Sequence, residues 1–372
     1  MKARPQPSII LIDIHDLLVA RTGIRTYIQE LHSALRENED PSTIIKVAPS
    51  LAFVEKLGLF RQNKSFIVSI LFHAYTFLWK QFALPLYTWA IGASYLICPD
   101  YLAPMWKLRS RKIVVFHDTF FWESPEDYNK YWLRYFKWLV KMGLRGNAKI
   151  LTVSETSMQR LEKLSITDKP LAYVHTSYQR RLPVAKDKAH PVPYFLHVGV
   201  LEKRKNLPLL IEAYAHARKK HTDMPDLVFI GQKGPKKDLD DAERIFESIE
   251  SHSLQEHVHW LDYVDEQLLS DYYAGAMAYV FPSRNEGFGL PVLEAFSFNI
   301  PVIISDQEAL VEIAHDAAYI VSPSSKDKWV EALVGIATEV EVRQSFISKG
   351  KVRLSHFNRS TFASKLIAEI SA

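Results

Sequence analysis

We expect neither an internal disulfide nor a secretion signal in this sequence of 372 residues. Its single cysteine, Cys98, has no partner within the chain, which fits a reducing compartment. Near the amino terminus, Asp13, His15 and Asp16 interrupt an apolar run before the core of a signal peptide could form. We therefore expect a cytoplasmic protein.

Long uninterrupted apolar runs are also missing. The most apolar part of the chain, residues 66–92, is long enough to raise the question of a transmembrane helix. However, Lys80 and Gln81 lie in the middle of this run and Pro85 breaks it. We expect helices of a folded domain here rather than a membrane span.

The net charge is small, +4, but it is unevenly distributed. Residues 1–180 contain 24 Lys and Arg against 15 Asp and Glu, a balance of +9, whereas residues 181–372 contain 22 against 27, a balance of −5. A basic first half favours an anionic partner, such as a phospholipid surface or a polyprenyl diphosphate. The alternative is an asymmetry without function, which is common.

The strongest functional signal lies in residues 277–296. The apolar run Met277–Phe281 predicts a buried strand, the polar and glycine residues after it predict a loop, and Pro291 suits the first turn of a helix. Backbone N–H groups at such a helix start converge at the positive end of the helix dipole, where anions bind. The groups expected to form this anion site belong to Gly287, Phe288, Gly289 and Leu290.

Two carboxylates, Glu286 and Glu294, flank the predicted anion site. This arrangement suits a ligand with phosphates in the middle and hydroxyl-bearing rings at both ends, which is the shape of a sugar nucleotide. The alternative is a tight turn beside two solvated glutamates, but the spacing of the motif argues against it.

The segment Glu286-Gly-Phe-Gly-Leu-Pro-Val-Leu-Glu294 resembles the Glu-x7-Glu signature of the retaining glycosyltransferases of the GT-B fold. This large family includes bacterial mannosyl- and glucosyltransferases. The resemblance implies that Glu286 contacts the donor sugar, that the amides of Gly287–Leu290 hold the diphosphate, and that Glu294 binds the ribose.

Further segments resemble the same family in the same order. Gly199-Val-Leu-Glu-Lys-Arg-Lys-Asn206 is similar to a family segment whose lysine binds the donor diphosphate, which implies this role for Lys205 and a second basic contact for Arg204. Arg21-Thr-Gly-Ile-Arg-Thr-Tyr27 is similar to a glycine segment of the family that lies near the donor phosphates. This similarity implies the same position for Gly23, although a bare turn would also explain this glycine. The segment Lys112-Ile-Val-Val-Phe-His-Asp118 predicts a strand that also has a counterpart in the family. The resemblance implies that His117, at the end of this strand, faces the donor sugar; the alternative is a core histidine.

The length of the chain exceeds what one compact core usually holds, so two domains are expected. The resemblance implies an α/β architecture, the GT-B fold, in which two Rossmann-like domains with parallel sheets face each other across a cleft. We expect an acceptor-binding domain at 1–182, a linker at 183–193, a nucleotide-sugar domain at 194–354, and a helix at 355–372 that returns to the first domain.

Residues 128–145 predict a helix with many Tyr, Trp, Lys and Arg side chains. Such a composition is typical of a membrane headgroup interface, where rings and cations both find partners. In the alternative, the aromatic side chains belong to the core and the cations are solvated. Together with the basic first half, the helix predicts docking on an anionic membrane, peripherally on the inner face of the plasma membrane.

The resemblance implies transfer of a hexose from a nucleoside diphosphate sugar to a glycan or polyprenyl-linked acceptor, with retention of configuration. Mannose from GDP-mannose, and a pathway of cell-surface polysaccharide or lipopolysaccharide synthesis, are the specific expectations. No cofactor, metal or nucleic acid is expected, and Asp238-Leu-Asp240, a metal-type pattern in a solvated stretch, is given no role. Two alternatives stay open: an epimerase that acts on the sugar nucleotide, and an inactive relative that serves as an assembly partner.

Overall fold

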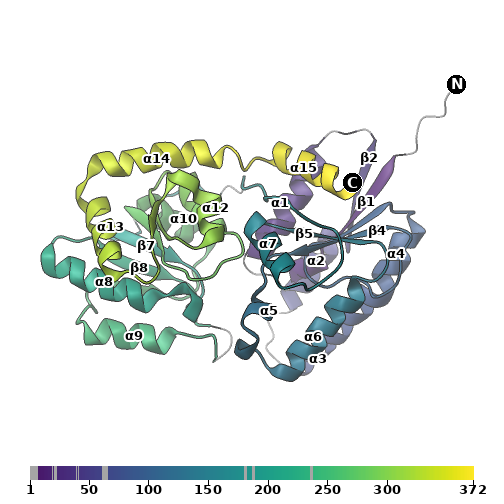
Figure 1. Ribbon diagram of the computed structural model, residues 1–372, viewed down its shortest axis with the longest axis horizontal. Helices are drawn as coiled ribbons and strands as arrows, with labels where there is room; N and C mark the ends of the chain where they lie inside the picture. Colours follow the sequence, from purple (N-terminus) through teal and green to yellow (C-terminus); the bar gives the residue numbers. More distant parts are fainter. Residues whose placement is uncertain are drawn as a thin grey trace. The chain divides into compact units, whose positions relative to one another are not determined.

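The chain forms two compact units in the computed structural model, each built on a six-stranded parallel sheet with helices packed around it (Figure 1). The first unit comprises Met1–Gln179 and Phe357–Ala372, and the second comprises Arg180–His356. The residues that the structure describes are 7–18, 20, 23–38, 40, 42–60, 66–179, 182–186, 189–234 and 238–372, without the side chains of 57–60 and 66–70.

The sheet of the first unit has the order β2-β1-β3-β4-β5-β6, with all pairs parallel. From β1 the chain steps to β2 on one side and then to β3 on the other, so the strand order reverses between β1 and β3. The central strands are almost continuously apolar because both faces of a parallel sheet are covered. The strands are β1 (Ser8–Asp13), β2 (Thr43–Ala48), β3 (Tyr95–Cys98), β4 (Arg111–Phe116), β5 (Ala148–Thr152) and β6 (Leu171–Tyr173).

The last helix of the chain, α15, packs within the first unit. Arg359 reaches from α15 to α1, with its Nη2 2.9 Å from Oε1 of Glu30, while Phe362 and Leu366 are buried. The helices of this unit are η1 (His15–Leu18), α1 (Gly23–Glu37), α2 (Leu51–Phe60), α3 (Phe66–Leu78), η2 (Trp79–Ala83), α4 (Leu84–Ala90), α5 (Phe120–Glu123), η3 (Pro125–Asp127), α6 (Lys130–Gly143), α7 (Glu155–Lys163) and α15 (Arg359–Ser371).

The apolar run 66–92 folds as α3, the π-helical turn η2 and α4. Lys80 and Gln81 are buried in η2, so the polar residues that interrupt the run face the interior of the unit. In the part of the chain that the structure describes, no helix has the length and apolar character needed to cross a membrane.

The sheet of the second unit has the order β12-β11-β10-β7-β8-β9, again all parallel. Its strand order reverses between β7 and β10. Large buried side chains such as Phe229, Tyr214 and Trp329 fill the core beside this sheet. The strands are β7 (Tyr194–Val198), β8 (Asp226–Ile230), β9 (Val258–Leu261), β10 (Ala278–Phe281), β11 (Val302–Ser305) and β12 (Tyr319–Val321).

The segment expected to be a linker lies against the second unit, apart from residues 187 and 188, which lie outside the described residues. Its backbone bonds to α10: the amide of Lys186 donates to Oδ1 of Asp271 at 2.8 Å, and the carbonyl of Pro183 accepts from Ser270. The helices of this unit are η4 (Lys203–Lys205), α8 (Leu207–Lys220), α9 (Ala242–Ser251), α10 (Glu266–Gly275), α11 (Leu290–Ser297), α12 (Glu308–Ala314), η5 (His315–Ala317), α13 (Lys326–Thr338) and α14 (Val340–Leu354).

Candidate active site

Two of the predicted motifs meet at the carboxyl ends of β7 and β10 in the second unit. One motif follows β7 and forms η4, and the other follows β10 and leads into α11. These two strands are neighbours at the point where the strand order reverses. Ligands of open α/β sheets bind in the crevice that such a reversal creates, so the topology places the motifs at the expected position.

An ion cluster joins the two motifs. Nζ of Lys205 and Nη1 of Arg204 each lie 2.7 Å from Oε1 of Glu286, across 81 or more positions of sequence. Lys205 and Glu286 are both buried, and the guanidinium of Arg204 also pairs with Glu202 at 2.7 Å. Neither Glu286 nor Lys205 is therefore a solvated surface group.

Two further side chains hold Glu286 in place. Ser283 donates its hydroxyl to Oε1 of Glu286 at 2.7 Å, and Gln307 donates its amide to the Glu286 carbonyl at 3.3 Å. Neither residue was predicted from the sequence to belong to the site. A serine three positions before the glutamate of the motif was a readable signal for Ser283, whereas Gln307 comes from a different strand end and had no signal of its own.

The neighbours of Glu286 control its protonation. Burial alone would raise the pKa of its carboxyl, but Arg204, Lys205 and the Ser283 hydroxyl together lower this pKa to about 2. The pKa of Lys205 is lowered by burial and by the charge of Arg204, while Glu286 opposes that change. At neutral pH the site therefore contains a carboxylate held between two basic groups.

A neutral histidine, His197, lies beneath this cluster in β7. Its Nδ1 is 3.0 Å from the Val280 carbonyl, and its buried Nε2 has no hydrogen-bond partner among the residues that the structure describes. Burial and the nearby charge of Lys205 lower the pKa of His197 to about 3. His197 was not predicted to belong to the site, because a histidine inside an apolar strand has the pattern of a core residue.

The loop before α11 depends on glycine at position 289. Gly289 has a φ of +116°, and a Cβ there would lie 2.8 Å from Cδ2 of Leu310. Any other residue would be strained and crowded at this position. Helix α11 begins at Leu290 with Pro291 in its first turn and no side-chain cap, so the predicted anion site is a helix start built from backbone.

Glu294 lies half-buried on α11, one turn beyond the loop. Its Oε2 accepts a hydrogen bond of 2.8 Å from the hydroxyl of Tyr273 in α10. The buried Tyr279 lies near both carboxylates, and burial together with the charges of Glu294 and Glu286 raises its pKa well above the usual range. Neither tyrosine was predicted to belong to the site.

The first unit contains the other two predicted site residues, Gly23 and His117. Gly23 is the first residue of α1, and the preceding Arg21 and Thr22 lie outside the described residues. His117 directly follows β4, and its Nε2 is 2.8 Å from the Pro99 carbonyl. Burial lowers the pKa of His117 to about 4, so its ring is neutral at pH 7.

An acid-rich cluster lies at the corresponding strand reversal of the first unit. Nζ of Lys80 is 2.8 Å from Oδ2 of both Asp13, the last residue of β1, and Asp16, which follows this strand. Asp100, which follows β3, has its pKa raised to about 7 by burial and by the charge of Asp16. From the sequence, Asp13, Asp16 and Lys80 were only interruptions of apolar runs and Asp100 had no assigned role, so the cluster was not predicted.

Within the pattern Asp238-Leu-Asp240, the side chain of Asp240 bonds to nearby backbone. Oδ1 of Asp240 accepts from the backbone N–H groups of Gly234 at 2.7 Å and Ala242 at 3.3 Å. Both bonds join the same carboxylate oxygen to nearby backbone, which gives Asp240 a structural role.

A comparison with protein-family models matches residues 179–353 to the family described as Glycosyl transferases group 1. This region contains both motifs of the ion cluster and nearly all of the second unit.

Two bacterial proteins are among the similar sequences. O-antigen chain mannosyltransferase B of Escherichia coli is 31% identical over 228 residues, which cover 58% of this chain and 58% of that protein. O-antigen chain mannosyltransferase RfbU of Salmonella typhimurium is 26% identical over 339 residues, which cover 88% of this chain and 90% of that protein. The chain thus spans under two thirds of the first relative and most of the second.

Solved structures resemble the whole chain. Sucrose-phosphate synthase from Thermosynechococcus elongatus superposes with a TM-score of 0.70 at 17% identity and covers 98% of both chains. The HepE protein of Anabaena, in complex with UDP and glucose, superposes with a TM-score of 0.68 at 13% identity over 98% of this chain and 99% of that one. At such identities the likeness shows a shared fold.

Proposed function

Because the chain belongs to the glycosyl transferases group 1 family and has the predicted two-domain α/β fold, we propose that it transfers mannose from GDP-mannose to a hydroxyl of a glycan acceptor. The observation that carries this proposal is the buried cluster of Arg204, Lys205 and Glu286 beside the start of α11. Mannose is preferred because the similar bacterial proteins are named as O-antigen mannosyltransferases.

The leaving diphosphate is the first charge that the site must stabilise. Lys205, Arg204 and the backbone at the start of α11 supply positive charge and N–H donors at one strand reversal. Preorganised donors of this kind stabilise charge that develops in a transition state. In our proposal no metal ion is required, because the two cations and the helix dipole supply the positive charge that a metal ion would otherwise provide.

The second charge is the positive charge that develops on the anomeric carbon. In our proposal the carboxylate of Glu286 stabilises this charge, and its pKa of about 2 keeps it ionised over the physiological pH range. Ser283 fixes the orientation of this carboxylate through its hydroxyl. Transfer then proceeds with retention on the face of the sugar that carries the leaving group.

The nucleotide end of the donor binds at α11. Glu294 accepts hydrogen bonds from the ribose hydroxyls, and Tyr273 positions its carboxylate from α10. No cofactor is needed, since the sugar nucleotide contains both the group that is transferred and the leaving group.

The first unit binds the acceptor at an anionic membrane surface, in our proposal. On α6, Tyr131 and Tyr135 are 73% and 51% exposed, and Trp132 and Trp138 are 42% and 49% exposed, which supports membrane docking over the alternative in which these rings fill the core. The described cations on the same helix are Lys130, Arg134, Lys137 and Lys141.

A cavity of about 420 Å³ lies between α6 and the helices α3 and η2, with Phe77, Leu102, Trp132, Tyr135 and Leu139 in its wall. Its apolar lining suits the polyprenyl chain of a lipid-linked acceptor. In our proposal the enzyme therefore docks peripherally on the inner face of the plasma membrane.

Vesicle binding tests the membrane part of the proposal. Cosedimentation with anionic vesicles should weaken as salt rises, because each Lys or Arg near such a surface contributes about 1 kcal/mol that salt screens. Changing Lys130, Arg134, Lys137 and Lys141 to Gln should weaken binding at every salt concentration, while the matched control, Lys219, Lys220, Lys349 and Lys351 to Gln in the second unit, should not. Indifference of the parent to anionic vesicles at low salt would refute membrane docking.

The activity itself is tested with labelled GDP-mannose and a lipid-linked glycan acceptor. A mannosylated acceptor with retained configuration, identified by mass spectrometry and NMR, is the expected product. Release of an epimerised sugar instead would indicate an epimerase, and absence of turnover with GDP- and UDP-sugars alike would indicate an assembly partner.

A further inference from the structure

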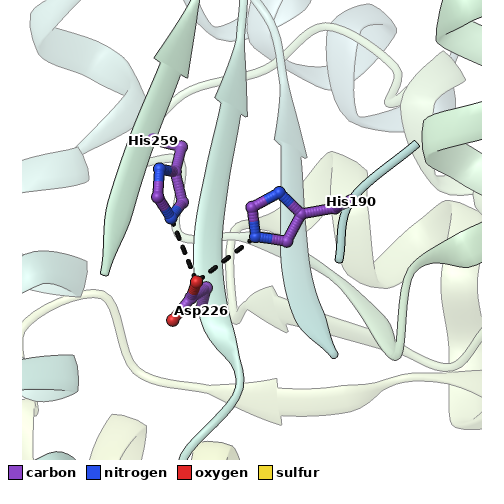
Figure 2. A group of neighbouring side chains, drawn as sticks. All are labelled: His190, Asp226 and His259. Atoms are coloured by element: carbon purple, nitrogen blue, oxygen red, sulfur yellow. Dashed lines mark hydrogen bonds and ion pairs between the residues drawn. The ribbon is translucent and has the colours of Figure 1, made fainter. Parts of the chain in front are cut away.

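A cluster of two histidines and one aspartate lies at the amino-terminal edge of the second sheet (Figure 2). Asp226 is the first residue of β8, His259 belongs to β9, and His190 comes from the segment that leads into β7. We infer that His190, Asp226 and His259 form a binding site for a divalent transition-metal ion, with Zn²⁺ as the best match. The inference does not depend on the proposed transferase activity.

The geometry brings three ligand atoms to one point. Nε2 of His190 and Nε2 of His259 lie 3.2 Å and 3.0 Å from the same carboxylate oxygen, Oδ2 of Asp226. All three atoms lie within 4.8 Å of one another. In a tetrahedral zinc site, metal–ligand bonds of about 2.0–2.2 Å place neighbouring ligand atoms roughly 3.3–3.6 Å apart. The observed spacing therefore needs only small side-chain adjustments to close around an ion.

The second oxygen of Asp226 is held by an outer shell. Nδ1 of His257 is 3.2 Å from Oδ1 of Asp226, and Nη2 of Arg218 is 2.9 Å from Nε2 of His257. Metal sites commonly orient their ligands through hydrogen bonds of this kind. His257 and Arg218 thus fix the carboxylate so that Oδ2 faces His190 and His259.

Solvent and ions can reach the cluster. A cavity of about 480 Å³ includes His190, Pro193 and Tyr194 in its wall, and the His259 side chain is 35% exposed. Two imidazole nitrogens and one carboxylate oxygen form a typical zinc ligand set, in which water occupies the fourth position. A metal ion would replace the hydrogen bonds between Asp226 and the two histidines.

The position of the site indicates a structural effect. The ion cluster of Lys205 and Glu286 lies beyond the carboxyl ends of the strands, and the histidine cluster lies at their amino ends. A five-residue strand is about 15 Å long, so a bound ion would not touch the donor. It would instead tie the segment before β7 to β8 and β9 and stabilise the second unit.

Calorimetric titration of the untagged, chelator-treated full-length chain with ZnCl₂ tests the inference. We expect one equivalent of Zn²⁺ to bind and the thermal unfolding midpoint to rise. His190→Asn and His259→Asn should each lose stoichiometric binding, and His257→Asn should weaken it about 10- to 100-fold, the usual effect of removing an outer-shell partner. His216→Asn and His252→Asn, outside the cluster, should bind like the parent.

Cobalt provides a readout that does not depend on the stability of a variant. The parent loaded with one equivalent of Co²⁺ should show the strong visible absorption of a four-coordinate ion, and Zn²⁺ should displace it. Failure of the parent to bind either ion stoichiometrically would overturn the inference. So would binding that survives in folded His190→Asn and His259→Asn variants, because the ion would then be held elsewhere.

Discussion

The two strand reversals of this protein differ in the charges that surround them. In the second unit, Arg204 and Lys205 meet Glu286 between β7 and β10. In the first unit, the charged residues at the ends of β1 and β3 are mainly acidic, with Asp13 and Asp16 sharing a single buried lysine. Basic groups beside a helix start suit a diphosphate, whereas buried carboxylates repel one and accept bonds from hydroxyls. In our proposal the edge of the second unit binds the sugar donor and the edge of the first unit faces the acceptor, so we call them the donor-type edge and the acceptor-type edge.

Each edge also contains a histidine that burial keeps neutral. The pKa of His197 in the second unit is lowered to about 3, and the pKa of His117 in the first unit to about 4. Neither ring contributes positive charge at neutral pH. The positive charge of the second edge therefore depends on Arg204 and Lys205, and substitutions at this edge test the comparison.

Removing Lys205 should have the largest effect. Lys205→Ala eliminates one of the two cations that contact Glu286, and loss of one preorganised group that stabilises transition-state charge typically costs about 10²–10³ in turnover. Lys203→Ala is the matched control, because Lys203 lies on the same short helix but is exposed. Steady-state kinetics with GDP-mannose measures both variants. Equal, small effects would show that the buried amine has no special role.

Glu286 should make stability depend on pH in the acid range. Its pKa is lowered from 4.5 to about 2, so its ionised form stabilises the fold fully above pH 4.5, and that contribution is lost as the pH falls through 2. The shift corresponds to about 3 kcal/mol. Urea unfolding between pH 6 and pH 2 should therefore show a steeper loss of stability for the parent than for Glu286→Gln. Parallel pH profiles would contradict the proposed ion cluster.

Glu294→Ala should have a smaller effect, which is confined to nucleotide binding. A charged hydrogen bond to a ribose hydroxyl is worth roughly 1.5–3 kcal/mol, so the Kd for GDP should rise about 10- to 150-fold. Tyr273→Phe, which keeps the carboxylate but removes its partner, should cost only about 0.5–1.5 kcal/mol. Calorimetry with GDP and UDP measures both variants. Unchanged affinity of Glu294→Ala for both nucleotides would rule out the ribose assignment.

The donor-type edge was largely predictable from sequence. Strands, glycine turns and helix starts were readable around Lys205 and Glu286, and parallel strands bring such loops to one edge of the sheet. The contact across 81 positions follows from that topology. Boundaries were less exact: the helix predicted at 128–145 spans Lys130–Gly143, because the Asn129 side chain caps it.

The acceptor-type edge was not predictable in the same way. Lys80 comes from a helical turn more than 60 positions after Asp13 and Asp16, and an interrupted apolar run does not reveal which carboxylates the lysine will meet. The histidine cluster was missed for the same reason, since His190, Asp226 and His259 belong to three separate segments with no common spacing. Only tertiary structure brings such groups together.

The central claim is that the second unit binds the donor and that Glu286 acts on the transition state. The most direct measurement compares kcat with the Kd for GDP-mannose in the parent and in Glu286→Gln. Our account predicts a kcat lower by about 10²–10³ and a nearly unchanged Kd, because the carboxylate matters most when the sugar carries positive charge. Equal losses in kcat and in donor affinity would contradict it and make Glu286 a simple binding residue.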